Sequence, residues 1–325
     1  MRSTFLAHFL IFGAVATALA QSQQTEPSSG QRPLDNSQPV VRITGVRFSY
    51  PLVQHWIDRF NKEHPNVQVI IESRGSSDPS QFDIMVEAYE QPEEIKKDRE
   101  YLYFARYAVL PVANGASRFV AAYKDKGLNK DLITQLFFFD IYAEKEKQKQ
   151  VREPFTVYTR LQKAGVPIVF SKYFGYAQKD LKGTAIAGAD EHLLKAVLRD
   201  SSGISYAPLP LIYNPVTGLP VEGLVVLPVD LNGNGRVSEE EKGYDRLPEV
   251  MTRLEDRTAK EVQNVPLEYV HFSVSRQSVA PAALVFLKWV IANGENDLHS
   301  FGFLKPEPRK AQNERFEQFA FRQTR

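Results

Sequence analysis

The chain has 325 residues, of which 43% are hydrophobic, and it contains no cysteine. The 40 basic and 39 acidic residues almost cancel, so the composition implies no large basic surface for nucleic acid. Without cysteine there is no disulfide framework, and the fold must be held by an ordinary hydrophobic core, which a chain of this length can supply.

The first 39 residues have the composition of an export signal followed by a flexible leader. Residues 1–20 combine a basic start at Arg2, a short apolar stretch and the cleavage motif Ala18-Leu19-Ala20, which is typical of a secretory signal peptide. Residues 21–39 are rich in Gln, Ser and Pro and are expected to be disordered. We therefore expect a soluble periplasmic or secreted protein without a lipid anchor, because the anchor would need a cysteine.

Strand and helix patterns alternate through the rest of the chain. A clear helix pattern begins at Pro51, where Ser49 is placed to cap it; Asn129 is placed to cap a second helix, and Gly294 to end a later one. The predicted strands are 40–43, 67–71, 82–86, 107–112, 119–123, 155–158, 203–206, 224–229 and 270–274. The predicted helices are 51–64, 130–141, 190–198, 247–258 and 280–293.

This alternation predicts the fold class and the domain organisation. Continuous apolar strands between helices indicate an α/β fold with mostly parallel sheets and helices on both faces. The roughly 285 residues after the leader are many for one core, so we expect two lobes. The predicted first lobe comprises residues 40–115 and resumes at 223–325, and residues 116–222 form the second. A cleft between two lobes is where a small ligand usually binds.

Residues 230–241 match an EF-hand-like calcium loop. Oxygen-bearing side chains occupy loop positions 1, 3, 5, 9 and 12, and Gly235 occupies position 6, where the chain must turn sharply. Position 7 contributes only its backbone carbonyl, so an arginine is acceptable there. Calcium takes about six to eight oxygens, which alternate residues of a tight loop can direct at one centre. The predicted metal ligands are Asp230, Asn232, Asn234, Arg236, Ser238 and Glu241.

The alternative for this loop is an Asn-Gly turn that joins a strand to a helix without a metal. We favour calcium because six requirements are met together. Only Asp230 and Glu241 are acidic ligands, so modest affinity is expected. The loop's own ligands saturate the ion, which predicts a structural role.

Several short segments stand out for their order and spacing along the mature chain. They are Gly45-Val46-Arg47-Phe48-Ser49-Tyr50-Pro51-Leu52, Glu72-Ser73-Arg74-Gly75-Ser76-Ser77, Phe82-Asp83-Ile84-Met85, Val157-Tyr158-Thr159-Arg160, and the segments 107–112, 128–136, 203–206 and 286–294. Together they resemble the periplasmic phosphate-binding proteins, the solute-binding subunits of phosphate ABC transporters. The chain looks like a divergent branch of that family with an inserted calcium loop, and the resemblance covers nearly all of the mature chain.

The resemblance implies a two-lobe type II periplasmic-binding fold that closes on its ligand by hinge motion. It also implies an oxyanion ligand, first of all phosphate, an ABC permease as partner, and a monomer. Backbone turns that open helices present N–H groups to an anion, and an arginine can grip two phosphate oxygens. Glu87, by approximate match, would accept the remaining proton of phosphate. The ligand residues carried over from the family are Arg47, Phe48, Ser49, Arg74, Ser76, Glu87 and Arg160.

The chain also departs from the family pattern. Arg47 stands where the family has a hydroxyl residue, and residues 161–167 lack the Ser-Gly-Thr donor loop that follows the family's arginine. The ligand could therefore be an organic or larger phosphorylated anion. Each candidate also has an ordinary structural alternative: the arginines as surface residues, Ser49 and Ser76 as helix or turn caps, and Glu87 as an ion-pair partner.

Two other functions compete with solute binding. One is a calcium-stabilised interaction or sensory module of the cell envelope whose cleft has decayed or changed its ligand; closure of the cleft by residues 160–167 would favour it. The other is an enzyme such as a phosphate-ester hydrolase. We expect no enzymatic activity, because the sequence has no Gly-x-Ser-x-Gly, no His-Glu-x-x-His and no cysteine.

Overall fold

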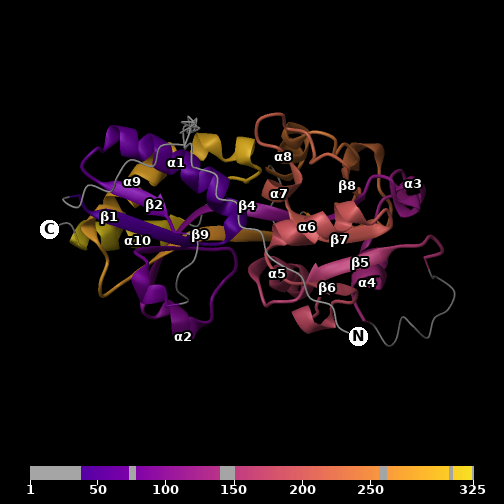
Figure 1. Cartoon of the computed structure of the whole chain (residues 1–325), viewed down its shortest axis with the longest axis horizontal. Helices are drawn as coiled ribbons and strands as arrows, with labels where there is room; N and C mark the ends of the chain where they lie inside the picture. Colours follow the sequence, from indigo (N-terminus) through magenta and orange to yellow (C-terminus); the bar gives the residue numbers. More distant parts are fainter. Residues whose placement is uncertain (1–37, 73–77, 140–150, 256–261, 307–309, 324–325) are drawn as a thin grey trace, which may run out of the picture. The chain divides into compact units, whose positions relative to one another are not determined.

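The computed structural model describes residues 38–72, 78–139, 151–255, 262–306 and 310–323. Within them, nine strands form a sheet in the order β2-β1-β3-β9-β4-β7-β5-β6, with β8 also paired to β4 (Figure 1). The predicted signal peptide and residues 21–37 of the leader lie outside this part of the chain, as do Arg74 and Ser76. No helix in the described ranges is long and apolar enough to cross a membrane.

The first lobe is built on three parallel strands and one antiparallel strand. β1 (Val40–Gly45) pairs in parallel with β2 (Gln68–Ile71) and with β3 (Ile84–Glu87). β9 (Leu267–Ser275) runs antiparallel to β3. The four strands confirm the predicted positions, but the sheet is mixed, because the strands that connect the lobes run antiparallel to their neighbours.

The longest strand, β4 (Arg99–Asn114), belongs to both lobes. Its first part pairs with β9 from Arg99 to Ala108, and its second part pairs with β7 from Val109 to Ala113. All but its first residue are buried. The sequence patterns predicted only residues 107–112 of this strand, so the first half was missed.

The second lobe combines parallel strands with the end of β4. β5 (Thr156–Arg160) lies between β6 (Thr184–Ile186) and β7 (Gly203–Pro208), parallel to both. β8 (Leu224–Val226) pairs with residues 112–114 at the second-lobe end of β4. The chain therefore returns to the first lobe through β9 rather than at residue 223.

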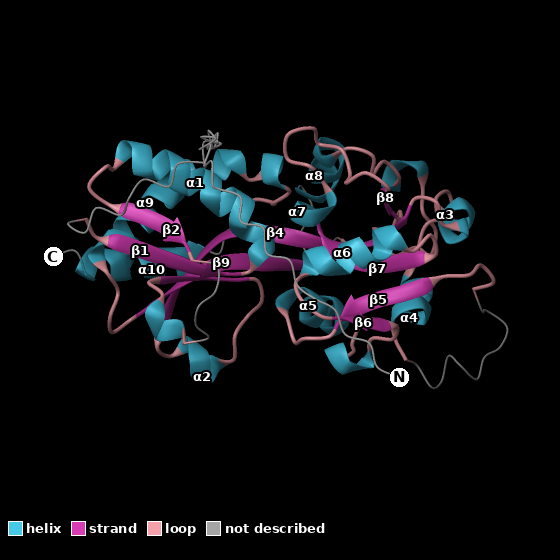
Figure 2. Ribbon diagram, viewed as in Figure 1, coloured by secondary structure: helices cyan, strands magenta, loops and turns pink. Residues whose placement is uncertain are grey.

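Helices flank the strands of both lobes (Figure 2). In the first lobe they are α1 (Tyr50–Glu63), α2 (Glu93–Lys96), α9 (Pro281–Asn293) and α10 (Lys310–Gln323). The others are α3 (Arg118–Tyr123), α4 (Lys130–Phe137), α5 (Gly165–Tyr173), α6 (Asp190–Arg199), α7 (Leu209–Ile212) and α8 (Leu247–Glu255). The predicted helices correspond to α1, α4, α6, α8 and α9, although α4 ends at Phe137.

One predicted strand, 119–123, is wrong, because these residues form α3. The Ser117 side chain caps this helix by accepting a hydrogen bond from the N–H of Phe119 at 3.1 Å. Phe119 is fully buried and stacks on Tyr123, one helical turn away. The aromatic and β-branched side chains favour a strand locally, but the cap and the burial of one helix face decide otherwise.

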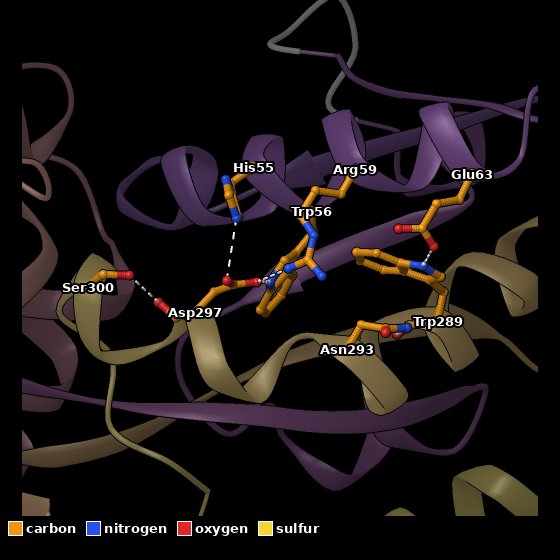
Figure 3. A network of polar contacts seen from close by, with 8 residues as sticks. All are labelled: His55, Trp56, Arg59, Glu63, Trp289, Asn293, Asp297 and Ser300. Atoms are coloured by element: carbon orange, nitrogen blue, oxygen red, sulfur yellow. Dashed lines mark hydrogen bonds and ion pairs between the residues drawn. The ribbon is translucent and has the colours of Figure 1, made fainter.

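A polar network joins α1 to the end of α9 (Figure 3). The Asp297 carboxylate accepts hydrogen bonds from Trp56 Nε1 at 3.0 Å and Arg59 Nη1 at 2.6 Å, and His55 Nε2 lies 3.4 Å away. Close packing accompanies these bonds, since a Cβ added at Gly294 would lie 2.9 Å from the Trp56 ring. The network fixes α1, and with it the turn that precedes this helix in the candidate site.

Candidate anion-binding cleft

A cleft of about 350 Å³ is lined by segments of both lobes. The first lobe contributes the end of β1, the turn of 3-10 helix at Arg47–Ser49 and side chains next to and within β3. The second lobe contributes the end of β5 and the first residues of α5 and α6. The lining residues are Thr44, Gly45, Val46, Arg47, Phe48, Tyr50, Phe82, Met85, Arg160, Ala164, Gly165, Val166, Ala189 and Asp190.

Arg160 is the charged centre of the second-lobe wall. Its Nη1 donates a hydrogen bond to Asp190 Oδ1 at 2.8 Å, and the two side chains are only 11% and 15% exposed. Its Nε is buried and has no hydrogen-bond partner among the described residues. Burial raises the pKa of the Asp190 carboxyl above its usual value, and the charge of Arg160 opposes part of that rise. The pair therefore places a charged guanidinium and a carboxyl group side by side on the second-lobe wall of the cleft.

Backbone donors surround this pair. The first N–H groups of α5, at Gly165 and Val166, have no acceptor within their own helix, and those at the start of α6 are in the same position. Neither helix has a side-chain cap from its N-cap residue, Ala164 or Ala189, although the side chain of His192 accepts from the N–H of Ala189. Helix N-termini carry partial positive charge, so the second-lobe wall is suited to an anion.

The first-lobe wall is a tight turn that only glycine allows. Gly45 has a φ of +144°, and a Cβ there would lie 2.0 Å from the carbonyl oxygen of Val86. The hydroxyl of Tyr50 bonds to both the N–H and the carbonyl of Gly45 at 3.1 Å. This arrangement fixes the following turn and puts Arg47 and Phe48 at the cleft.

The described structure therefore brings together three of the predicted ligand residues, Arg47, Phe48 and Arg160. Ser49 is not on the cleft wall, since it is fully buried and its hydroxyl donates to the carbonyl of Val46 at 2.7 Å. It does not cap α1 through its side chain either. Arg74 and Ser76 lie outside the described residues.

Glu87 is also engaged elsewhere. Its carboxylate accepts hydrogen bonds from Ser273 Oγ and Gln91 Nε2, both at 2.6 Å, and lies 3.6 Å from the buried His271. Burial opposes ionisation of Glu87, but hydrogen bonds and charges from His271, Ser273 and Arg99 outweigh it, so its pKa lies below the usual value. Glu87 is thus an acceptor inside the first lobe rather than a residue of the cleft wall.

The sequence patterns missed Asp190 and the α5 N-terminus as parts of this site. Residues 161–167 lack the hydroxyl donors of the family pattern, but a helix begins at Gly165 and its first backbone N–H groups are donors. The run Ala-Gly-Val-Pro at 164–167 was the available signal, because proline is favoured in the first turn of a helix. Asp190 was read only as a helix start.

The predicted calcium loop folds with its two carboxylates turned inward. Asp230 accepts hydrogen bonds from the N–H groups of Asn234 at 3.2 Å and Gly235 at 2.8 Å. Glu241 accepts from those of Asn232 at 2.9 Å and Ser238 at 2.8 Å. Asp230 is 1% exposed and Glu241 2% exposed, and Leu231 beside Asp230 is buried, whereas residues 232–236 and 238–240 are exposed.

This loop is attached to the second lobe and to the segment that leads into β9. The Asn129 side chain donates to the carbonyl of Gly235 at 3.4 Å. Asn264 Nδ2 donates to the carbonyl of Asp230 at 2.8 Å. Asn264 has a φ of +63°, a left-handed conformation that asparagine tolerates better than most residues. In the described ranges no three His, Cys, Asp or Glu side chains cluster as a metal site, so any ion here would depend on amide, hydroxyl and carbonyl oxygens as well.

The two lobes joined by antiparallel crossover strands, with an anion-suited cleft lined by both, define a type II periplasmic-binding fold. Comparison with solved structures agrees. The chain is similar to a protein from Clostridium perfringens described as a phosphate ABC transporter substrate-binding protein with bound phosphate. The TM-score is 0.61 and the identity 14%, over 82% of this chain and all of the other.

A second solved structure, an ABC-type phosphate transport receptor from Vibrio cholerae, gives a TM-score of 0.54 at 12% identity, again over 82% of this chain and all of the other. At these identities the likeness shows the fold alone. No family model matches the sequence, and no curated protein matches it.

Proposed function

We propose that this chain is an exported solute-binding protein that captures an oxyanion, with phosphate as the first candidate, for an ABC-type transporter. The observation that carries the proposal is the convergence of Arg160, two helix N-termini and the Arg47–Phe48 turn on one cleft. Both similar structures described above are, by their descriptions, phosphate-transport binding proteins, one of them with phosphate bound. The proposed activity is binding and release without turnover.

The geometry suggests how an anion would be held. Arg160 stays oriented by Asp190 through its Nη1 and lines the cleft, where its charge would attract a ligand oxygen. The backbone N–H groups at the starts of α5 and α6 add neutral donors, which bind an anion without a second full charge. Arg47 would approach from the first lobe, so that the anion bridges the two lobes and favours their closure.

The competing interaction or sensory module receives less support. That function predicted that residues 160–167 pack shut over the cleft. Instead, Arg160, Ala164, Gly165 and Val166 border an open hollow. The position of Asp190 against Arg160 favours a changed ligand, since it reduces the positive charge of the cleft.

We also propose that residues 230–241 bind a structural calcium ion. Asp230 and Glu241 are buried and form no ion pair with any described side chain, and two buried carboxylates are costly without a nearby cation. Their oxygens, the side chains of Asn232, Asn234 and Ser238 and the Arg236 carbonyl would hold the ion. Bound calcium would supply the missing positive charge.

The direct test of the anion proposal is calorimetric titration of the mature chain, dialysed free of phosphate, at fixed calcium concentration. Phosphate is the ligand and sulfate the control. We expect a Kd for phosphate of about 1 μM or tighter, a binding free energy of about −8 kcal/mol, and no comparable heat with sulfate. Absence of heat with phosphate would refute the proposal and leave the sensory or interaction module as the better account.

A further inference from the structure

A second and larger hollow, of about 670 Å³, lies beside the cleft on the second lobe. It is bordered by the end of β5, by α5, and by the segment from residue 176 to β6. Arg160, the residue proposed to hold the anion, lines both the cleft and this second hollow. We call this second hollow the basic groove.

The charged side chains that line the basic groove are all positive. Its charged lining residues are Arg160, Lys163, Lys172 and Lys179, and no acidic residue among the described ranges lines it. The three lysines form no ion pair with any described residue. Elsewhere on the protein Lys96 and Lys242 do have carboxylate partners. Several unpaired cations around one concave surface raise the local concentration of anions.

The rim that carries Lys163 is held in place. The side chain of Gln178 donates to the carbonyl of Gln162 at 3.0 Å and accepts from the N–H of Ala164 at 3.4 Å. The side chain of Gln162 accepts from the N–H of Gly188 at 3.0 Å. Loop 161–164 is thus fixed from two neighbouring segments, which favours a formed site over a random collection of lysines.

The groove also has apolar walls. Leu161, Ile168, Tyr176 and Leu181 contribute to its lining, and Leu161 is 60% exposed. An inorganic phosphate ion would leave these walls and the lysines unused. Cavities of several hundred cubic ångströms that combine apolar walls with a few charged groups are typical of organic ligands.

We propose that the ligand of this protein is an elongated organic phosphate: its phosphate group binds in the cleft at Arg160, its apolar body lies along the basic groove, and a second negative group is held by Lys163, Lys172 and Lys179. This inference rests on the proposed oxyanion-binding function and names its ligand class. The missing hydroxyl donors in residues 161–167 fit it, because a ligand held also in the groove depends less on donors around the phosphate.

Three probes of increasing size test this proposal by calorimetry: inorganic phosphate, phenyl phosphate and 4-carboxyphenyl phosphate. The second adds an apolar body, and the third adds a negative group. We expect affinity to rise at each step. The combined change Lys163→Gln, Lys172→Gln and Lys179→Gln should weaken 4-carboxyphenyl phosphate by about tenfold, as expected for three exposed charge pairs, and leave inorganic phosphate nearly unchanged.

A matched control carries Lys62→Gln, Lys130→Gln and Lys195→Gln, three exposed lysines outside the groove. It has the same net charge and should bind all three probes as the wild type does. Equal affinity of the wild type for the three probes, or equal loss in both triple variants, would overturn the groove proposal and leave phosphate binding intact. Failure of every probe, inorganic phosphate included, would overturn the proposed function itself.

Discussion

The pairing of Arg160 with Asp190 fixes the guanidinium at the candidate cleft. An arginine that is nearly buried loses hydration, and Asp190 compensates part of that loss while it fixes the guanidinium in one orientation. Because the carboxylate accepts only from Nη1, the guanidinium keeps further N–H groups and its positive charge for the proposed ligand.

Replacement of Arg160 by alanine should strongly weaken phosphate binding. A hydrogen bond to a charged group contributes about 1.5–3 kcal/mol, so we expect a loss of about 10- to 100-fold in Kd by calorimetry. Arg199→Ala is the control. Arg199 is exposed in the last turn of α6, and its replacement removes the same positive charge. Similar effects of the two changes would show that Arg160 does not contact the anion.

Glu87 should make folding stability depend on acid pH. Its folded pKa is lowered, so its ionised form stabilises the folded state at pH values above its ordinary pKa of about 4.3. This contribution is lost as the pH falls through the lower folded pKa. The melting temperature of Glu87→Gln should therefore lie below that of the wild type at pH 7, and the difference should shrink towards pH 3. A gap that is constant with pH would contradict this assignment.

At the scale of single residues, the sequence could predict groups whose role depends on local context. Arg160 ends a strand pattern and Arg47 precedes a helix, and both lie at the cleft. Asp190 could not be predicted as a partner of Arg160, because 30 residues separate them and only the parallel alignment of neighbouring segments brings them together. Glu87 was assigned by position after a strand, whereas its bonds to Ser273 and Gln91 depend on tertiary packing.

At the scale of elements, the predictions hold where a long apolar pattern is buried against the sheet, as in α1 and α9, or where it is joined by a side-chain cap, as Asn129 provides for α4. They fail where local propensity and packing disagree, as in α3. Helix α10 was missed because it is largely polar and buries only a narrow stripe that includes Phe316 and Ala320. Its place is fixed by tertiary contacts, among them paired hydrogen bonds between the Asn313 side chain and the backbone of Tyr103 at 3.0 and 3.1 Å.

The calcium loop predicts a stability effect that depends on metal. Glu241→Gln should lower the melting temperature in calcium and abolish the shift that a chelator causes in the wild type, because one ligand charge is removed. Glu240→Gln is the control, since this exposed neighbour is not a predicted ligand. A wild-type protein that melts identically with calcium and with chelator would exclude the site.

The network at Asp297 makes a prediction about the attachment of α1. Asp297→Asn removes the negative charge of the carboxylate to which Trp56 and Arg59 both donate hydrogen bonds. We expect the free energy of unfolding, measured in urea, to fall by about 1–3 kcal/mol. Asp125→Asn, at an exposed loop position, should change stability little. Equal stability of both variants would mean that the packing of Trp56 and Phe60 alone holds this helix.

For the whole molecule, an anion that bridges the cleft should bring the lobes together. Small-angle scattering should then show a smaller radius of gyration with saturating phosphate than without it. The Arg160→Ala variant at the same phosphate concentration should keep the larger value. No change in the wild type, at a concentration where calorimetry shows saturation, would mean that the ligand binds without closure.

Because β4 is shared between the two lobes, we expect the lobes to unfold together. A strand that is buried along its length and paired with β9 in one half and β7 in the other cannot leave one core without disturbing the next. Residues 38–325 accordingly form one compact unit by their contacts. We therefore expect the two lobes to unfold as one cooperative unit. A destabilising substitution in the core of either lobe should then speed the unfolding of both.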